Sequence, residues 1–206
     1  MISKEVKNYL STNDSVLGKI IKEISEIHIE STNDVFFDLM SCAIEQQIHY
    51  RSNKKIFRKL LDKAEIEHLS IQNFSQFEEK ALSTIKLSQA KLQTILGLFR
   101  FFNTEKINWH LLDDQEVIEQ LSSIKGIGKW TIDMILLYTL QRPNVFPADD
   151  YHLKQIMIRL YNLNPNSMLK KQMLDISSFW GEHASSAVRI LLAWKEHQKH
   201  FRNGKD

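Results

Sequence analysis

The chain has 206 residues, a net charge of +2, and 43% hydrophobic against 25% charged residues. That composition is typical of a globular protein and is too apolar for a disordered chain. The near-neutral charge does not by itself indicate a nucleic-acid-binding protein. The single cysteine, Cys42, excludes an intramolecular disulfide and an iron–sulfur cluster held by four cysteines.

No apolar run approaches the ~20 residues that a membrane span needs. The first residues, MISKEVKNYL, lack the apolar segment of a signal peptide. We therefore expect a cytoplasmic protein that does not bind a membrane. The length fits one compact unit or two small subdomains.

Helical hydrophobic spacing runs through almost the whole chain, glycine and proline are scarce, and Val-rich alternating runs are absent. The fold class that this pattern predicts is all-α. In chain order we expect helices over residues 16–27, from a cap at Asn33 or Asp34 through Ile48, and over 54–61, 74–82 and 88–102. The next helix runs from a cap at Asp113 or Asp114 through Leu121, and another runs from a glycine turn at 126–128 through Leu140. The last three are expected over 151–160, 169–176 and 184–198. Pro143 and Pro147 bracket an extended connection, because proline and the residue before it resist helix.

A Gly126-Ile127-Gly128 turn joins two of these helices. Glycine permits the positive φ or the close packing that such a turn needs, and the N–H groups of Gly126, Gly128 and Lys129 at a helix N-terminus suit a phosphate. Lys125 and Lys129 can add positive charge. A plain helix–helix corner with a glycine cap is the alternative interpretation.

An acidic pair, Asp149 and Asp150, follows the turn by about twenty residues. Such a pair can supply a carboxylate to whatever the glycine turn holds. Its position before Tyr151-His152-Leu153 is equally that of an ordinary helix N-cap.

The longer pattern, with Leu121 and Ile124 before the glycines and Thr131 and Ile135 after them, resembles the helix-hairpin-helix (HhH-GPD) DNA glycosylases of base excision repair. The resemblance is closest to the monofunctional 3-methyladenine DNA glycosylase II type. It is strong over residues 121–155 and weaker over 34–58 and 82–95. It implies two helical subdomains flanking a DNA-binding cleft: a central barrel over 33–141 containing the hairpin at 115–140, and a second subdomain built from 1–32 and 142–206.

This resemblance makes Asp150 the catalytic residue and gives Asp149 a capping or loop-fixing role. A carboxylate stabilises the positive charge that builds on the deoxyribose as the base departs, and it can orient or deprotonate water. Bifunctional relatives carry a lysine nucleophile at the second residue after the hairpin. Trp130 occupies that position, and Lys129 points elsewhere on the helix, so we expect base removal by water without strand cleavage.

The resemblance also implies the remaining site residues. The expected base-pocket residues are Trp130, Met134, Tyr151 and Phe37. The expected DNA contacts are Gly126, Gly128, Lys129, Thr131, Lys125, and the turn Gln46, Gln47 and Ile48, with Ile48 as a wedge in the duplex. Main-chain carbonyls of Ser122, Ile124 and Ile127 would hold a structural monovalent cation, Na⁺ or K⁺; no other cofactor is expected.

The expected partner is duplex DNA containing a damaged base. We expect the protein to be a monomer and to act at the bacterial nucleoid. The segment from Trp180 to Ala187 lacks the family's usual proline and arginine, which leaves the lesion range open. A glycosylase for another lesion, such as a deaminated base, and a non-catalytic DNA-binding module are the alternatives. His183, His197 and His200 are expected to be surface histidines rather than metal ligands.

Overall fold

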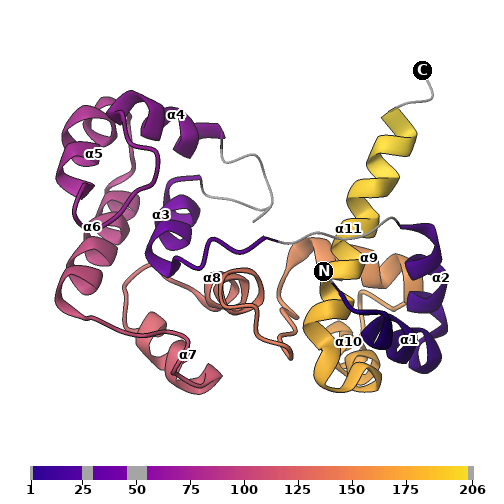
Figure 1. Cartoon of the computed structure of the whole chain (residues 1–206). Coiled ribbons are helices and arrows are strands. Elements are labelled where there is room, and N and C mark those ends of the chain that lie inside the picture. The colour runs from indigo at the N-terminus through magenta and orange to yellow at the C-terminus, as the bar shows by residue number, and fades with distance from the viewer. Residues whose placement is uncertain (1, 25–29, 46–54, 204–206) are drawn as a thin grey trace. The chain divides into compact units, whose positions relative to one another are not determined.

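The computed structural model describes residues 2–24, 30–45 and 55–203, and throughout these ranges every regular element is helical (Figure 1). The all-α prediction is confirmed. The α-helices are α1 (Lys4–Asn13), α2 (Ser15–Glu23), α3 (Val35–Glu45), α4 (Lys55–Ala64), α5 (Phe74–Lys80), α6 (Gln89–Thr104), α7 (Asp114–Ser122), α8 (Lys129–Met134), α9 (Tyr151–Tyr161), α10 (Leu169–Ser177) and α11 (Ala184–Asn203). Three short elements of other helical type are η1 (Leu82–Thr84), η2 (Ile135–Thr139) and η3 (Ser178–His183).

The chain divides into two compact units. The hairpin unit is Ser31–Leu140, and the terminal unit combines Met1–Glu30 with Gln141–Asp206. The sequence predicted a central subdomain over 33–141 and a second one built from both chain ends.

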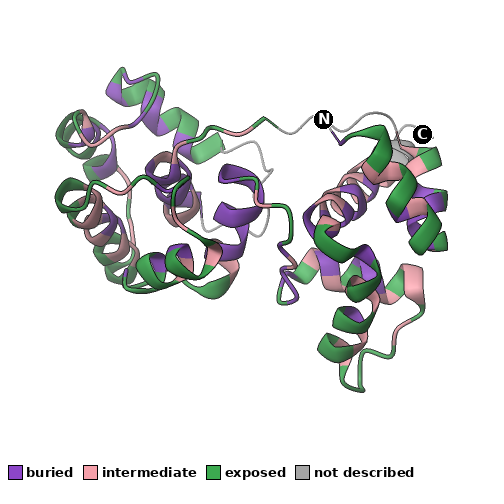
Figure 2. Ribbon diagram, turned by 60° about the horizontal axis from the view of Figure 1, so that its bottom comes forward, coloured by how far each residue is buried: buried purple, intermediate pink, exposed green. Residues whose placement is uncertain are grey.

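In the hairpin unit, α3 packs against α4, α6 and η2, and α7 packs against α8 across the glycine turn. Every residue from 132 to 140 is buried, which Figure 2 shows as purple on the α8–η2 helix. A helix that is buried on all sides lies inside a core, and its polar side chains Asp133 and Thr139 are bonded to Lys129 and Asp38. The fully buried side chains of the hairpin unit include Leu39, Phe57, Phe77, Leu98 and Leu121.

The end of this central helix widens into the π-helical turn η2, in which Leu140 N–H donates to Ile135 C=O at 2.9 Å. Asp38, a buried acid of α3, accepts from the hydroxyls of Thr139 at 2.7 Å and Thr32 at 2.6 Å. A buried carboxylate is stable only when it is hydrogen-bonded. These bonds therefore fix α3 to the widened turn.

In the terminal unit, α11 packs against α2 and α9, and α1 packs against α2 and η3. Asp14 joins these elements. One of its oxygens caps α2 by accepting from Val16 and Leu17 N–H, at 2.9 and 3.0 Å. The other accepts from the Tyr161 hydroxyl of α9 at 2.7 Å and from Trp180 Nε1 of η3 at 2.8 Å.

The predicted helices differ from the observed ones mainly near the N-terminus. Helix α1 was not predicted. The helix expected to reach Ile27 ends at Glu23, and Ile24 is already extended. The segment predicted as one helix over 74–82 is α5 followed by the separate turn η1. Asp34 rather than Asn33 caps α3, since its carboxylate accepts from Phe37 N–H at 2.9 Å.

Candidate functional site

The glycine turn is held by its own backbone and by α6. Ile124 is buried, and its carbonyl accepts from Ile127 N–H at 3.1 Å. Gly126 has φ +94°, and a Cβ built there would lie 2.0 Å from Thr94 Oγ1 of α6. Both the positive φ and the close approach of Thr94 therefore require glycine at this position.

The turn delivers an exposed helix N-terminus. Gly128 caps α8 with φ −97° and ψ 167°, and no side chain bonds the first amides of that helix. Gly126, Gly128, Lys125 and Lys129 are exposed, and Thr131 in the first turn of α8 is half-buried. Uncapped N–H groups together with the helix dipole favour an anion. Five predicted DNA-binding residues thus lie together on this turn.

Lys129 is less available than the sequence indicated. Its ammonium lies 2.8 Å from both oxygens of Asp133, one turn along the same helix. The Asp133 side chain is almost fully buried, whereas that of Lys129 is 63% exposed. The charge predicted to face DNA is therefore paired within α8, whereas Lys125 is exposed on the turn itself.

The predicted wedge residues Gln46, Gln47 and Ile48 lie outside the described residues. The cation site expected at the carbonyls of Ser122, Ile124 and Ile127 stays a prediction. Ser122 is the last residue of α7, and the Ile124 carbonyl accepts from Ile127 N–H.

Across the described ranges, no group of three or more His, Cys, Asp or Glu side chains could hold a metal ion. His183, one of the predicted surface histidines, packs edge-on against Tyr9, with ring centroids 5.0 Å apart.

The expected base-pocket residues of the hairpin unit differ in accessibility. Trp130 is half-buried, next to Lys129 at the start of α8, and Met134 is only 2% exposed. Phe37 stacks on His68 at 4.2 Å and meets Phe57 edge-on at 5.2 Å. Met134 therefore belongs to the core, whereas Phe37, which packs on His68 and Phe57, and Trp130 are both half-buried.

Asp150, in the terminal unit, is the N-cap of α9. It is 5% exposed, and its Oδ1 accepts from Leu153 N–H at 2.7 Å. A negative charge at a helix N-terminus is stabilised by the backbone amides and the dipole. The carboxylate is thus fixed in direction and held near the first turn of α9.

Asp149 does not cap the helix, so the predicted capping role belongs to its neighbour. Its carboxylate instead lies 3.1 Å from Lys170 Nζ and 3.7 Å from Lys154 Nζ. Asp150 directly precedes α9 and has the extended backbone, φ −65° and ψ 124°, that an N-cap requires. Next along the chain, Tyr151 is 60% exposed, and the side chain of His152 contacts that of Lys195 from α11.

The loop that carries Asp150 is held by residues whose role the sequence reasoning missed. Ser185, buried at the start of α11, accepts from Val145 N–H at 2.8 Å through its hydroxyl, and its own N–H donates to Pro143 C=O at 3.1 Å. The Phe146 ring meets Trp180 edge-on at 5.7 Å. The sequence signal was present, since Trp180 and Ser185 both lie in the segment from Trp180 to Ala187 that resembles the family.

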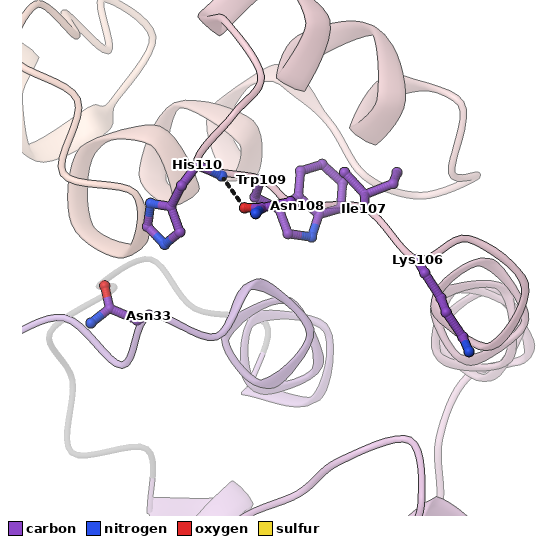
Figure 3. A pocket seen from close by; sticks show the side chains of 6 residues that line it. All are labelled: Asn33, Lys106, Ile107, Asn108, Trp109 and His110. Carbon is purple, nitrogen blue, oxygen red and sulfur yellow. Dashed lines mark hydrogen bonds between the residues drawn. The ribbon is translucent and has the colours of Figure 1, made fainter.

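A hollow of about 430 Å³ lies at the connection between α6 and α7, and Figure 3 shows the side chains that line it. It is lined by Asn33 and the connection from Lys106 to His110, where His110 N–H donates to Asn108 Oδ1 at 3.3 Å. None of the predicted site residues lines it.

The model of the HhH-GPD superfamily, described as a base excision DNA repair protein, matches residues 40–182. The chain therefore belongs to the HhH-GPD superfamily of base excision DNA repair proteins, as the glycine turn and the aspartate loop indicated. No helix among the described residues is long and apolar enough to cross a membrane.

Individual relatives agree with this membership. DNA-3-methyladenine glycosylase 1 of Schizosaccharomyces pombe is 28% identical over 195 residues, covering 90% of this chain and 82% of that protein. The crystal structure of a DNA-3-methyladenine glycosidase from Bacillus halodurans is similar at a TM-score of 0.73 and 24% identity, covering 94% of this chain and 88% of that one. Mag1 of S. pombe, solved in complex with abasic DNA, is similar at a TM-score of 0.72 and 22% identity, covering 93% of this chain and 96% of that one.

Proposed function

We propose that this protein is a monofunctional DNA glycosylase that removes alkylated purines, of the 3-methyladenine type, from duplex DNA. The observation that carries the proposal is Asp150: a nearly buried carboxylate fixed at the N-terminus of α9, in a chain that belongs to a base excision repair superfamily. The names of the S. pombe and B. halodurans proteins support alkylated purines as the substrate class.

The reaction requires few catalytic groups besides that carboxylate. Breaking an N-glycosidic bond builds positive charge on the deoxyribose, and a fixed anion stabilises that charge. The same group can orient or deprotonate the attacking water. An alkylated purine is already cationic and leaves readily, so a carboxylate and a base pocket suffice. The target base must first leave the helical stack, at a cost of a few kcal/mol.

Trp130 supports water rather than an amine as the nucleophile. A strand-cleaving relative would carry a lysine at this position, and an indole cannot form a Schiff base. The neighbouring ammonium of Lys129 is engaged by Asp133 at 2.8 Å. The half-buried indole offers instead an aromatic face, which attracts an electron-poor alkylated base.

The test is release of free base from methylated duplex DNA by wild type, Asp150→Asn and Asp149→Asn. Asparagine caps helices as well as aspartate does, so Asp150→Asn keeps the bond to Leu153 N–H while it removes the charge. We expect 3-methyladenine release to fall by roughly 10²- to 10⁴-fold in Asp150→Asn, the range of an acid–base group. Asp149→Asn, an exposed neighbour, should keep most of the activity.

Equal release by wild type and Asp150→Asn would refute the catalytic assignment. If wild type binds damaged duplex but releases no base from methylated DNA, the substrate class is wrong. Repeating the assay on duplex carrying a deaminated base would then separate an enzyme for another lesion from a non-catalytic DNA-binding module.

A further inference from the structure

A second hollow, of about 360 Å³, borders the glycine turn inside the hairpin unit. Its wall is formed by Cys42 near the end of α3, by Ser88, Lys91 and Thr94 at the start of α6, and by Gly126 and Thr131 of the hairpin. Its volume is within the range of ligand sites. We call it the hairpin hollow.

The lining of the hairpin hollow suits an anionic ligand that accepts hydrogen bonds. Among the described residues that line it there is no carboxylate, and Lys91 supplies the only charge. The hydroxyls of Ser88 and Thr131 can donate hydrogen bonds to a ligand, whereas the hydroxyl of Thr94 donates to Ala90 C=O at 3.1 Å. An anion bound there would be met by one cation and two hydroxyl donors.

Lys91 is held at the edge of this hollow by a contact of its own. Its Nζ donates to Ile44 C=O at 3.0 Å, in the last turn of α3. Desolvation lowers the pKa of Lys91, and the charge of Glu45 opposes that shift. The same Glu45 accepts from Phe57 N–H at 2.7 Å. The ammonium is thus positioned by the fold, and it has three N–H donors in total.

The position of the hollow links it to the anion-binding end of α8. Gly126 and Thr131 line the hollow and also belong to the turn and first helical turn that present exposed amides. A phosphate on those amides would therefore be adjacent to the mouth of the hollow. DNA carries a phosphate on every nucleotide. A duplex held at the turn would therefore bring a neighbouring phosphate to the hollow within the same binding event.

We propose that the hairpin hollow binds the sugar–phosphate backbone of duplex DNA, beside the phosphate held by the glycine turn, with Lys91 as its cationic contact. This inference rests on the proposed function, since it assumes that duplex DNA is the ligand. The hollow adds a charged contact to a hairpin whose own Lys129 is engaged by Asp133.

Cys42 provides a direct test in the wild-type chain, because it is the only cysteine in the sequence and it lines the hollow. The measurement is its rate of modification by a small thiol reagent, with and without duplex carrying an abasic-site analogue. At a duplex concentration about ten times Kd, about one tenth of the protein is free, so an occupied hollow should slow the reaction about tenfold. Fluorescence anisotropy under the same conditions measures how much duplex is bound.

Two outcomes would overturn the proposal. If Cys42 reacts at its full rate while anisotropy shows saturation with duplex, the DNA does not enter the hollow. If inorganic phosphate alone protects Cys42 at the same concentrations, the ligand is a small anion instead. If wild type releases base and binds duplex without protecting Cys42, only this inference fails; if it neither binds damaged duplex nor releases base, the proposed function fails.

A charge variant gives an independent measurement. Lys91→Met should weaken duplex binding several-fold and make the plot of log affinity against log salt shallower by about 0.9, the value of one phosphate contact. Lys91→Arg should restore most of the slope, and Lys80→Met, which removes an exposed lysine of α5, should leave it unchanged. An unchanged slope in a folded Lys91→Met protein would contradict the assignment of Lys91.

Discussion

Lys129 and Asp133 form an ion pair one helical turn apart at the start of α8, with the ammonium 2.8 Å from each carboxylate oxygen. The pair joins a mostly exposed lysine to a nearly buried acid. It directs the lysine along its own helix rather than toward the exposed amides of the glycine turn. The two lysines that flank this turn should therefore behave differently.

Lys125→Met should act on DNA binding, and Lys129→Met mainly on stability. For Lys125→Met we expect the salt dependence of duplex binding to become shallower by about 0.9, because one phosphate contact is lost. For Lys129→Met we expect less than half that change, with a loss of about 1 kcal/mol in the free energy of unfolding, since the pair is partly exposed. Salt titrations and urea unfolding of both variants measure this, and equal slopes in the two would contradict it.

The two glycines of the turn should also separate folding from binding. Gly126→Ala has to adopt φ +94° and would bring a Cβ to 2.0 Å from Thr94 Oγ1, so we expect a loss of at least ~1–2 kcal/mol in stability from the φ alone. Gly128 has an ordinary φ of −97°, and a Cβ there would meet nothing within 4 Å. Gly128→Ala should therefore change the melting temperature little, because the lower entropy of the unfolded chain is offset by the poorer helix capping of alanine.

The effect of Gly128→Ala on DNA binding tests which way the turn faces. A methyl group beside the first amides of α8 keeps a phosphate at a distance, so duplex affinity should fall although folding is intact. Anisotropy on an undamaged duplex measures this, with thermal melting as the control. Wild-type affinity in a stable Gly128→Ala protein would show that the phosphate does not approach these amides.

Local chemistry explains which parts of the structure were predictable. Asp113 and Glu116 form the reciprocal capping box that their spacing encodes, and Ser88 caps α6 through Lys91 N–H at 3.3 Å. Helix α1 was not predicted, since its apolar pattern is limited to Val6, Tyr9 and Leu10, of which only Leu10 is buried. The π-helical turn η2 also escaped, since its widening accompanies the tertiary bonds of Asp38 rather than any local pattern.

The site was predictable in its chain positions but not in its bonding. The glycine turn and the aspartate loop are recognisable from spacing, whereas the choice of Asp150 over Asp149 as the cap depends on backbone angles that both residues could adopt. Lys129 and Asp133 have the i, i+4 spacing at which a helical ion pair forms. The sequence alone does not show whether the ammonium of Lys129 binds this carboxylate or a phosphate of DNA.

Ser185→Ala should lower activity more than it lowers duplex binding. The change leaves the N–H of Val145 without the hydroxyl that accepts from it at 2.8 Å, at a cost of about 1–3 kcal/mol. It also loosens the loop that carries Asp150. Because small misplacements of a reacting group slow catalysis strongly, we expect kcat for base release to fall about ten- to a hundredfold.

The matched control for that change is Ser186→Ala, at the next, half-buried position of α11. Single-turnover base release and anisotropy on an abasic-analogue duplex measure the two quantities separately. A Ser185→Ala protein that loses binding and kcat in the same proportion would contradict a role confined to the catalytic loop.

Tyr161 should make the terminal unit sensitive to alkaline pH. Burial, together with the hydrogen bond to Asp14 and the charge of that acid, raises the pKa of Tyr161 far above its usual value of 10.0. A tyrosine that stays neutral when folded but ionises when unfolded stabilises the fold below the unfolded pKa, and that contribution is lost as pH rises above about 10. Over that window the group alone lowers the free energy of unfolding by about 1.4 kcal/mol per pH unit.

Tyr161→Phe isolates this contribution. At neutral pH it should reduce the free energy of unfolding by about 1 kcal/mol, because the hydroxyl no longer donates to Asp14. Above about pH 10 its stability should fall less steeply than that of wild type, so the two curves converge. Urea unfolding at a series of pH values measures both curves, and Tyr151→Phe, which removes an exposed hydroxyl, is the control. Parallel curves for wild type and Tyr161→Phe through the alkaline range would show that Tyr161 ionises as readily in the folded protein as in the unfolded chain.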